Sequence, residues 1–235
     1  MRDPITHEIR RFAVLDSTND YCFRNLHSLS SGSVVAAGYQ DAGKGTQGRS
    51  WTSNKDENLL FSIIYKDEPF TTLPLFSLRI ALALVKVLKE YDLSPMIKWP
   101  NDILIADQKI AGILIEVKQS VCVVGIGFNI NQQDFPTDLN LPATSLTNQL
   151  KKTYEPLAVL LKVLDGIDEV LTWKDDEVLM KYRKLLYQKN QTCVVNLNQK
   201  KFMAKIMDID DDGVLVVMDN DNQRIRIPSK AMLEG

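Results

Sequence analysis

The sequence predicts an α+β fold: a mixed β-sheet with helices, followed by a small C-terminal β-barrel. Two observations support this. In the first part of the chain, strand-like apolar runs alternate with segments whose leucines recur at three- and four-residue steps. Beyond about residue 190, the chain consists of short strand-like runs in which apolar and polar residues alternate, separated by Asn, Asp and Gly. At ~150 residues per domain, the 235 residues provide one sizeable core and one small appendage.

The first half supplies the predicted sheet. Ser17-Thr18-Asn19-Asp20 is rich in N-cap residues and predicts a helix over 21–29. An amphipathic helix carries leucines at 75, 78, 82 and 88. Strands are expected at 33–40, 58–65, 96–99, 103–105, 109–117 and 121–131.

The second half begins with two amphipathic helices. One has Leu157, Leu160, Leu161, Leu164, Ile167 and Leu171 on a face, and the other has Leu179, Tyr182 and Leu186. Short strands then follow at 192–197, 201–207, 214–218 and 223–227. We therefore expect a boundary near Tyr187, with a larger domain over 1–187 and the small barrel over 188–235.

The composition excludes several classes of protein. The 28 Lys and Arg residues against 30 Asp and Glu give a net charge of -2, so there is no cationic field to hold nucleic acid non-specifically. The longest apolar stretch, about 121–128, is far shorter than the ~20 residues of a membrane span. The first residues do not form a secretory signal. Three widely spaced cysteines fit a reducing compartment, and we expect a cytoplasmic protein.

A glycine-rich loop over 43–48 (GKGTQG) satisfies G-x-G-x-x-G after a strand. The following RSWTSNKDE has no apolar periodicity, so the helix required by a dinucleotide-binding fingerprint is missing. The loop also fails as a P-loop, because Gly45 stands where a Ser or Thr would hold Mg²⁺. Two interpretations remain open: an anion-wrapping loop that uses Lys44 and Arg49, or a plain surface loop.

The aspartates of the segment 208–219 occupy the positions of an EF-hand loop. The flanking sequences alternate like strands, whereas this calcium loop needs a helix on both sides. A turn between two barrel strands explains the sequence DIDDDG equally well, because Asp and Gly tolerate left-handed backbone conformations. We therefore favour the turn over a calcium site.

Two further features lie in the apolar sheet region. Lys98-Trp99-Pro100-Asn101-Asp102 places a cation and a carboxylate at a proline-containing turn, which is either a functional site or a rigid hairpin with a core Trp. Lys109 begins an apolar strand and would either extend outward to solvent or hold an anion. Gly125 and Gly127 in the next strand indicate close approach of a ligand or of another backbone.

Taken in order, LDSTND, YQDAGKGTQGRSW, KWPNDILIADQKIAGILIE and VVGIGFNIN resemble the biotin protein ligases, or biotin–acetyl-CoA-carboxylase ligases. These motifs cover 16–131, about half of the chain. The resemblance implies a sheet like that of class II aminoacyl-tRNA synthetases and an SH3-like C-terminal barrel. It also implies a two-step reaction. Biotin and ATP give biotinyl-5′-AMP and pyrophosphate, and the biotin then passes to a lysine of a biotin carboxyl carrier protein.

The resemblance also assigns roles to individual residues. Lys109, Arg49 and Lys98 correspond to catalytic cations, which this chemistry needs because a carboxylate attacking a phosphate must overcome repulsion between anions. The residues that correspond to the biotin site are Ser17, Thr18, Asn19, Gln40, Gly43, Lys44, Gly45, Thr46, Lys109, Gly112 and Gly125. Those that correspond to the ATP site are Arg49, Trp51 (stacked on adenine), Lys98, Asn101, Asp102 (also a Mg²⁺ ligand), Gly127 and Asn129.

The chain departs from the family pattern in two places. Many members carry G-R-G-R-x-G-R in the loop, whereas Lys44 and Thr46 replace the two internal arginines here and leave Arg49. Only sixteen residues precede Ser17, so we expect no helix-turn-helix domain and no DNA partner. The short apolar stretches lead us to expect no membrane partner, and we expect the protein to be a monomer or a homodimer. We also expect the loop to become ordered over the adenylate, because a mixed anhydride exposed to water would hydrolyse.

Two alternatives remain at this point. One is a lipoate or octanoate ligase or transferase of the same fold. The other is a non-catalytic biotin-binding module whose barrel docks a partner. The retained cations favour catalysis, because a protein that only binds biotin does not need them.

Overall fold

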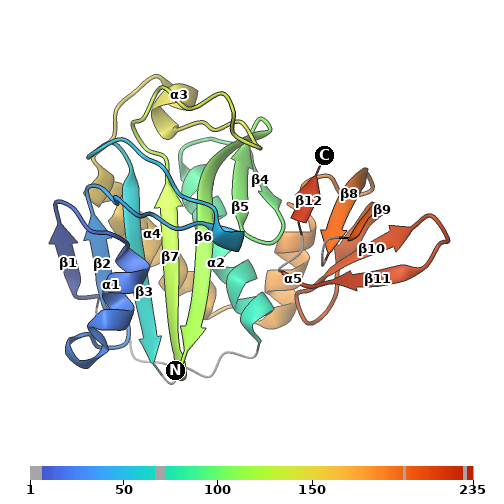
Figure 1. The fold of residues 1–235 in the computed structure, drawn as a ribbon, viewed down its shortest axis with the longest axis horizontal. Helices are drawn as coiled ribbons and strands as arrows, with labels where there is room; N and C mark the ends of the chain where they lie inside the picture. Colours follow the sequence, from blue (N-terminus) through green and yellow to red (C-terminus); the bar gives the residue numbers. More distant parts are fainter. Residues whose placement is uncertain (1–6, 67–71, 198–199, 230–231, 235) are drawn as a thin grey trace.

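The computed structural model describes residues 7–66, 72–197, 200–229 and 232–234. Its larger sheet has seven strands in the order β1-β2-β3-β7-β6-β5-β4 (Figure 1). The strands are β1 (Ile9–Phe12), β2 (Val34–Ala37), β3 (Leu59–Lys66), β4 (Pro95–Lys98), β5 (Asp102–Ile105), β6 (Gln108–Lys118) and β7 (Val121–Phe128). β1 and β2 pair in parallel and the other neighbours are antiparallel. The predicted mixed sheet with helices is therefore confirmed.

Helices cover both faces of this sheet. α2 (Leu73–Glu90) and α4 (Pro156–Leu171) pack on one face, and α1 (Thr18–Arg24) lies on the other (Figure 1). The remaining helical segments are α3 (Leu146–Leu150), α5 (Asp175–Arg183), and the short 3₁₀ turns η1 (Leu26–Ser28) and η2 (Thr46–Gly48). No helix in the described part of the chain is long and apolar enough to cross a membrane.

Strand β3 (LLFSIIYK) is almost continuously apolar, as expected for a strand whose two faces are both covered. Phe61 and Ile63 belong to the large core under α2 and α4. Ile64 belongs to a smaller cluster under α1 that includes Cys22 and Val123. Ser62, fully buried on the α1 side, interrupts this apolar run with a hydroxyl group.

The C-terminal part forms a second, five-stranded antiparallel sheet in the order β11-β10-β9-β8-β12. Its strands are β8 (Thr192–Leu197), β9 (Lys200–Ile209), β10 (Leu215–Asp219), β11 (Arg224–Ile227) and β12 (Met232–Glu234). β11 and β12 are the two edges in this order. A small antiparallel sheet is thus present, and its closure into an SH3-like barrel stays a prediction.

The segment 208–219, whose aspartates have EF-hand spacing, forms the end of β9, the turn that follows it, and β10. Asp210 Oδ1 accepts hydrogen bonds from the backbone N–H groups of Asp212 (3.1 Å) and Val214 (2.9 Å). The guanidinium of Arg226 lies 2.6 Å from a carboxylate oxygen of Asp210 and 2.6 Å from one of Asp212. Over the described residues, no group of three or more His, Cys, Asp or Glu side chains could hold a metal ion. The carboxylates are occupied in turn formation and ion pairs.

The segment after α5 joins the two sheets. The Ile97 N–H donates to the carbonyl of Leu185 (2.8 Å), and the Tyr187 N–H donates to the carbonyl of Ile97 (2.9 Å). Leu186, which we expected on the last helix, lies instead in a bridge beside β4, because α5 ends at Arg183. One apolar core runs through both parts of the chain, and the division into 1–187 and 188–235 stays a prediction.

Candidate active site

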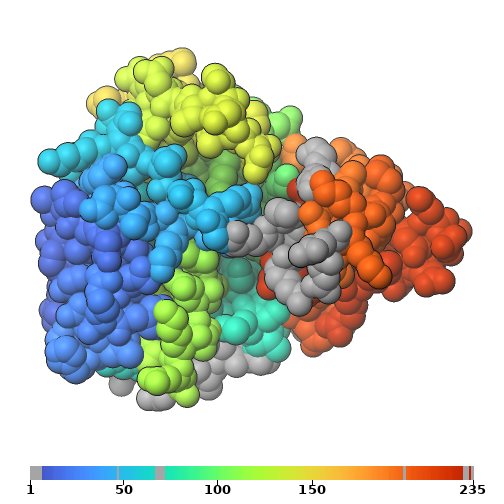
Figure 2. All heavy atoms as spheres, viewed as in Figure 1, coloured from blue at the N-terminus to red at the C-terminus, as the bar shows by residue number. Residues whose placement is uncertain are grey.

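A cleft lies on the face of the larger sheet that carries α1. Its walls come from the start of α1, the glycine-rich loop, strands β5 to β7 and the segment 135–143. In Figure 2 the light-blue atoms of the glycine-rich loop and the yellow-green atoms of the 135–143 region lie on two sides of this hollow.

The structure brings most of the residues named from the sequence together here. The cleft is lined by Ser17, Thr18, Asn19, Gln40, Lys44, Gly45, Thr46, Arg49, Trp51, Asn101, Asp102, Lys109, Gly112, Gly125, Gly127 and Asn129. The two exceptions are Gly43, which lines a second hollow that shares loop residues with the cleft, and Lys98, which lies at the end of β4. The sequence did not reveal the wall formed by 135–143, because this segment lacks regular secondary structure and motif residues.

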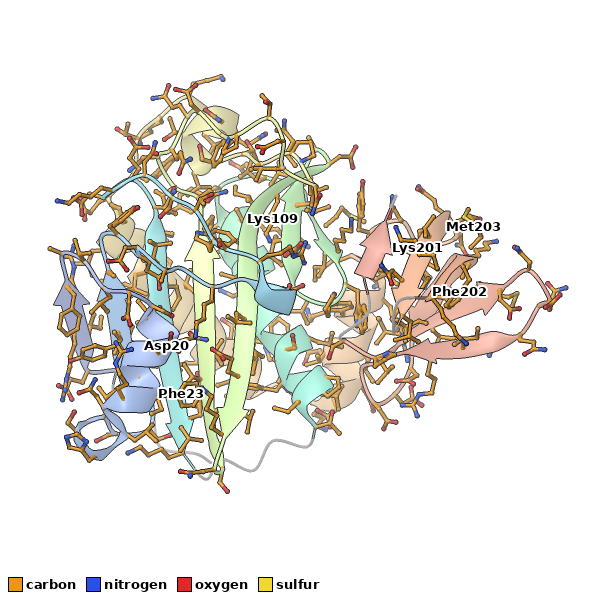
Figure 3. The ribbon with its side chains drawn as sticks, viewed as in Figure 1. Asp20, Phe23, Lys109, Lys201, Phe202 and Met203 are labelled. Atoms are coloured by element: carbon orange, nitrogen blue, oxygen red, sulfur yellow. The ribbon has the colours of Figure 1, made fainter. Side chains whose placement is uncertain are left out.

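The cationic end of the cleft is organised around Lys109, labelled in Figure 3. Its ammonium lies 2.7 Å from Oδ1 of Asp102 and 5.1 Å from the ring centre of Trp51. The Trp51 ring lies directly on the backbone of two strands: a Cβ placed on Gly127 would be 2.3 Å from the ring, and one on Gly112 would be 2.8 Å from it. These two glycines are therefore required for the close approach of an aromatic ring to the sheet.

Lys98 lies partly buried next to this cationic group. Burial lowers the pKa of Lys98 below the ordinary lysine value, and the positive charges of Arg49 and Lys109 lower it further, although the carboxylate of Asp102 acts in the opposite direction. Lys98 thus interacts electrostatically with all three charged residues of the cleft end while standing outside its lining.

The glycine-rich loop folds as a tight turn held by its own polar groups. The Gly45 N–H donates to the carbonyl of Arg49 (2.7 Å) and the Trp51 N–H to that of Gly43 (2.9 Å). The Arg49 guanidinium donates to the hydroxyl of Thr46 (3.0 Å). The loop is tied to α1 by the Lys44 ammonium, which lies 2.6 Å from the Asp20 carboxylate. The two residues that depart from the family pattern, Lys44 and Thr46, therefore both make side-chain contacts that help to hold the loop.

The opposite end of the cleft is a buried polar network. The backbone N–H (2.7 Å) and hydroxyl (3.0 Å) of Thr18 donate to Oε1 of Gln40. Ser62 Oγ lies 2.7 Å from Thr18 Oγ1 and 2.6 Å from Asn19 Oδ1. Asn19 Nδ2 donates to a carboxylate oxygen of Glu116 (2.8 Å). Ser62 and Glu116 were not predicted from the sequence, although the single serine within NLLFSIIY was a usable signal for Ser62.

The side-chain amides of two predicted ATP-site residues bind the protein backbone. Asn101 Nδ2 donates to the carbonyl of Ile113 (2.8 Å), and Asn129 Nδ2 donates to that of Thr144 (3.0 Å). These bonds fix the turn before β5 and the segment after β7, and both side chains still line the cleft. Contact of either with a nucleotide stays a prediction.

Asp102 is the one carboxylate among the described residues that line this cleft. It is already ion-paired with Lys109, and a Mg²⁺ site built from protein groups alone needs more ligands than one carboxylate. The donor set fits only a Mg²⁺ ion whose other ligands are water and substrate phosphates.

Comparison with known proteins gives a consistent result. Residues 11–131 match the model of the biotin/lipoate A/B protein ligase family. The chain is 30% identical over 227 residues to the bifunctional ligase/repressor BirA of Bacillus subtilis, covering 88% of this chain and 68% of that protein. It is 35% identical over 121 residues to the biotin–[acetyl-CoA-carboxylase] ligase of Mycobacterium tuberculosis, covering 49% of this chain and 45% of that protein.

Among solved structures, the biotin protein ligase of Aquifex aeolicus in complex with biotin and ATP superimposes with a TM-score of 0.87 at 26% identity. The superposition covers 96% of this chain and 98% of that one. The C-terminal sheet is therefore part of the shared architecture. The curated relatives are longer: the match spans about two thirds of the Bacillus protein and less than half of the Mycobacterium protein.

Proposed function

This chain belongs to the biotin/lipoate A/B protein ligase family, and from that premise we propose that it is an ATP-dependent biotin–protein ligase. The supporting observation is that one cleft joins a buried polar end, at Thr18, Asn19 and Gln40, to a cationic end at Lys109. A biotin molecule lying along this cleft places its ring system at the polar end and its carboxylate beside the cations.

The polar end favours biotin over lipoate. The ureido ring of biotin carries two N–H donors and one carbonyl acceptor, and such groups bind tightly only where buried partners match them. The network of Thr18, Asn19, Gln40 and Ser62 supplies buried hydroxyl and amide groups. A dithiolane ring has no N–H or carbonyl group and could not form such hydrogen bonds with these polar groups.

In the first step a carboxylate oxygen of biotin attacks the α-phosphorus of ATP. The bond from that phosphorus to the oxygen bridging to the β-phosphate breaks, and pyrophosphate leaves. Lys109, Arg49 and Lys98 reduce the repulsion between the two anions and stabilise the charge that develops on the phosphoryl oxygens. Asp102 would be the protein ligand of a Mg²⁺ ion bound with ATP, which would supply neutralisation of phosphate charge.

In the second step the amine of a carrier lysine attacks the acyl carbon of biotinyl-5′-AMP, and AMP leaves. We propose a biotin carboxyl carrier protein as the acceptor. The glycine-rich loop, held by the Lys44–Asp20 and Arg49–Thr46 contacts, covers the mixed anhydride and limits its hydrolysis by water.

The test is biotin-dependent exchange of pyrophosphate into ATP, measured with the purified protein and compared with lipoate. We expect exchange with biotin and its loss in Lys109→Ala. Absence of exchange with biotin would contradict the proposal, and exchange with lipoate alone would reassign the substrate. Mass spectrometry of a carrier domain incubated with enzyme, biotin and ATP separates a ligase, which adds one biotin, from a protein that only binds the vitamin.

A further inference from the structure

The amide of Asn19 is held on three sides, and each contact constrains its orientation. A Cβ added to Gly125 would lie 2.4 Å from Asn19 Oδ1, so the amide lies flat on the backbone of β7. Its oxygen faces the hydroxyl of Ser62 at 2.6 Å, and its nitrogen faces the carboxylate of Glu116 at 2.8 Å. Asn19 and Ser62 are buried, whereas Glu116 is partly exposed.

Glu116 decides which way this amide points. An ionised carboxylate only accepts hydrogen bonds, so it must face the NH₂ group of Asn19. The reverse orientation would place the carbonyl oxygen of Asn19 against the carboxylate, and would turn the NH₂ group towards Ser62 and the cleft end. The carboxylate therefore fixes Asn19 Oδ1 as an acceptor at the polar end of the cleft.

Glu116 itself stands outside the cleft. It lies on β6 beyond Leu114 and lines a second hollow, which shares residues of the glycine-rich loop and Leu114 with the cleft. Asn19, in contrast, lines the cleft. Glu116 contacts the cleft lining through the Asn19 amide, and its charge also acts on Lys44, whose pKa it helps to raise.

We propose that Glu116 is a positioning residue for biotin: by fixing the Asn19 amide, it keeps a hydrogen-bond acceptor directed at the N–H groups of the ureido ring. This inference rests on the proposed function, because it takes biotin as the ligand. A flipped Asn19 would present N–H donors to the ureido N–H donors, and both would remain unpaired in a buried site.

The first experiment measures the dissociation constant for biotin, the KM for ATP and the thermal midpoint of the full-length protein. Glu116→Met removes the acceptor at similar size and should weaken biotin binding about tenfold, as expected for a lost hydrogen bond to a charged group. Glu116→Gln retains an oxygen acceptor and should restore most of the affinity. The KM for ATP should change less than about twofold in both variants, because ATP binds at the other end of the cleft. Lys118→Met, two residues along the same face of β6, is the matched control and should bind biotin like the wild type.

A reciprocal exchange tests orientation rather than simple packing. Asn19→Asp places two carboxylates against each other and should weaken biotin binding by more than about tenfold. Adding Glu116→Gln reverses donor and acceptor across the contact and keeps an oxygen facing Ser62, so the double variant should recover most of the lost affinity and of any lost thermal stability. A residue that only packs would not produce this recovery.

The outcomes separate the two proposals. If the wild type binds biotin, the role of Glu116 is overturned by either of two results: unchanged binding in Glu116→Met, or no recovery of binding in the double variant. Both results leave the proposed function intact. No biotin binding by the wild type overturns the proposed function, together with the inference that depends on it. Both proposals are supported if the wild type and Lys118→Met bind biotin, the single variants Asn19→Asp and Glu116→Met lose affinity for it, and the double variant recovers that affinity.

Discussion

The ammonium of Lys109 and the carboxylate of Asp102 form an ion pair of 2.7 Å at the cationic end of the cleft. Asp102 follows the KWPN turn and Lys109 lies on the adjacent strand β6, so the β5–β6 hairpin itself brings the two together. The pair holds the ammonium in position before substrates enter. Under the proposed function, Asp102 is also the one carboxylate of the described cleft lining that a nucleotide-bound Mg²⁺ would contact.

Asp102→Asn should therefore impair catalysis much more than biotin binding. We expect kcat for biotin-dependent exchange to fall by about tenfold or more, and the Mg²⁺ concentration for half-maximal rate to rise. The dissociation constant for biotin should change by less than about twofold, because the ureido end lies away from this pair. Asp107→Asn, at the exposed turn of the same hairpin, is the control. Equal losses in the two variants would contradict a specific role for Asp102.

The lowered pKa of Lys98 predicts how the catalytic rate should depend on pH. Because burial lowers the pKa of Lys98 below its ordinary 10.5, its positive charge is lost at a lower pH than that of an exposed lysine. If that charge assists phosphoryl transfer, kcat/KM should decline as pH rises through this lowered pKa. Lys98→Arg keeps the charge to higher pH and should move the alkaline decline upward. An unchanged profile in Lys98→Arg, with Lys118→Arg as the control, would show that a different group titrates.

Most of the larger sheet was predictable because β3, β6 and β7 are long apolar runs and the shorter β2, β4 and β5 are also largely apolar. The motif residues also meet in one cleft, as the order of the motifs in the sequence implied. β1 was missed because IRRF is short and half polar, and its pairing with β2 is visible only in three dimensions. Leu186 was assigned to a helix because its spacing continues the apolar face of α5, and tertiary pairing with Ile97 prevails there. Glu116 was not found because the strand pattern shows only that it shares a face with Leu114.

The Lys44–Asp20 ion pair predicts the behaviour of the glycine-rich loop. The two groups lie 2.6 Å apart, and hydrogen bonding to Asp20 raises the pKa of Lys44 above its ordinary value. Asp20→Asn should speed tryptic cleavage at Lys44, Arg49 and Lys55 in the ligand-free protein, and biotin with ATP should slow it in both forms. Asp16→Asn, which removes a carboxylate bound to Arg24 instead, should leave loop cleavage near the wild-type rate. Cleavage that biotin and ATP fail to slow would rule out ordering of the loop over the adenylate.

The contact of Trp51 with Gly127 allows adenine recognition to be tested separately from biotin binding. A Cβ at residue 127 would lie 2.3 Å from the indole, so Gly127→Ala must displace the ring from β7. If Trp51 stacks on adenine, the KM for ATP should rise by about tenfold, the order of magnitude found for loss of one base–aromatic stack. The dissociation constant for biotin should stay within about twofold of the wild type. Gly166→Ala, in helix α4 where a Cβ meets only ordinary contacts, is the matched control.

Tryptophan fluorescence provides an independent measurement, because ATP should change the emission of the wild type and should have little effect on Trp51→Phe. A KM for ATP that stays unchanged in Gly127→Ala would place the adenine elsewhere in the cleft.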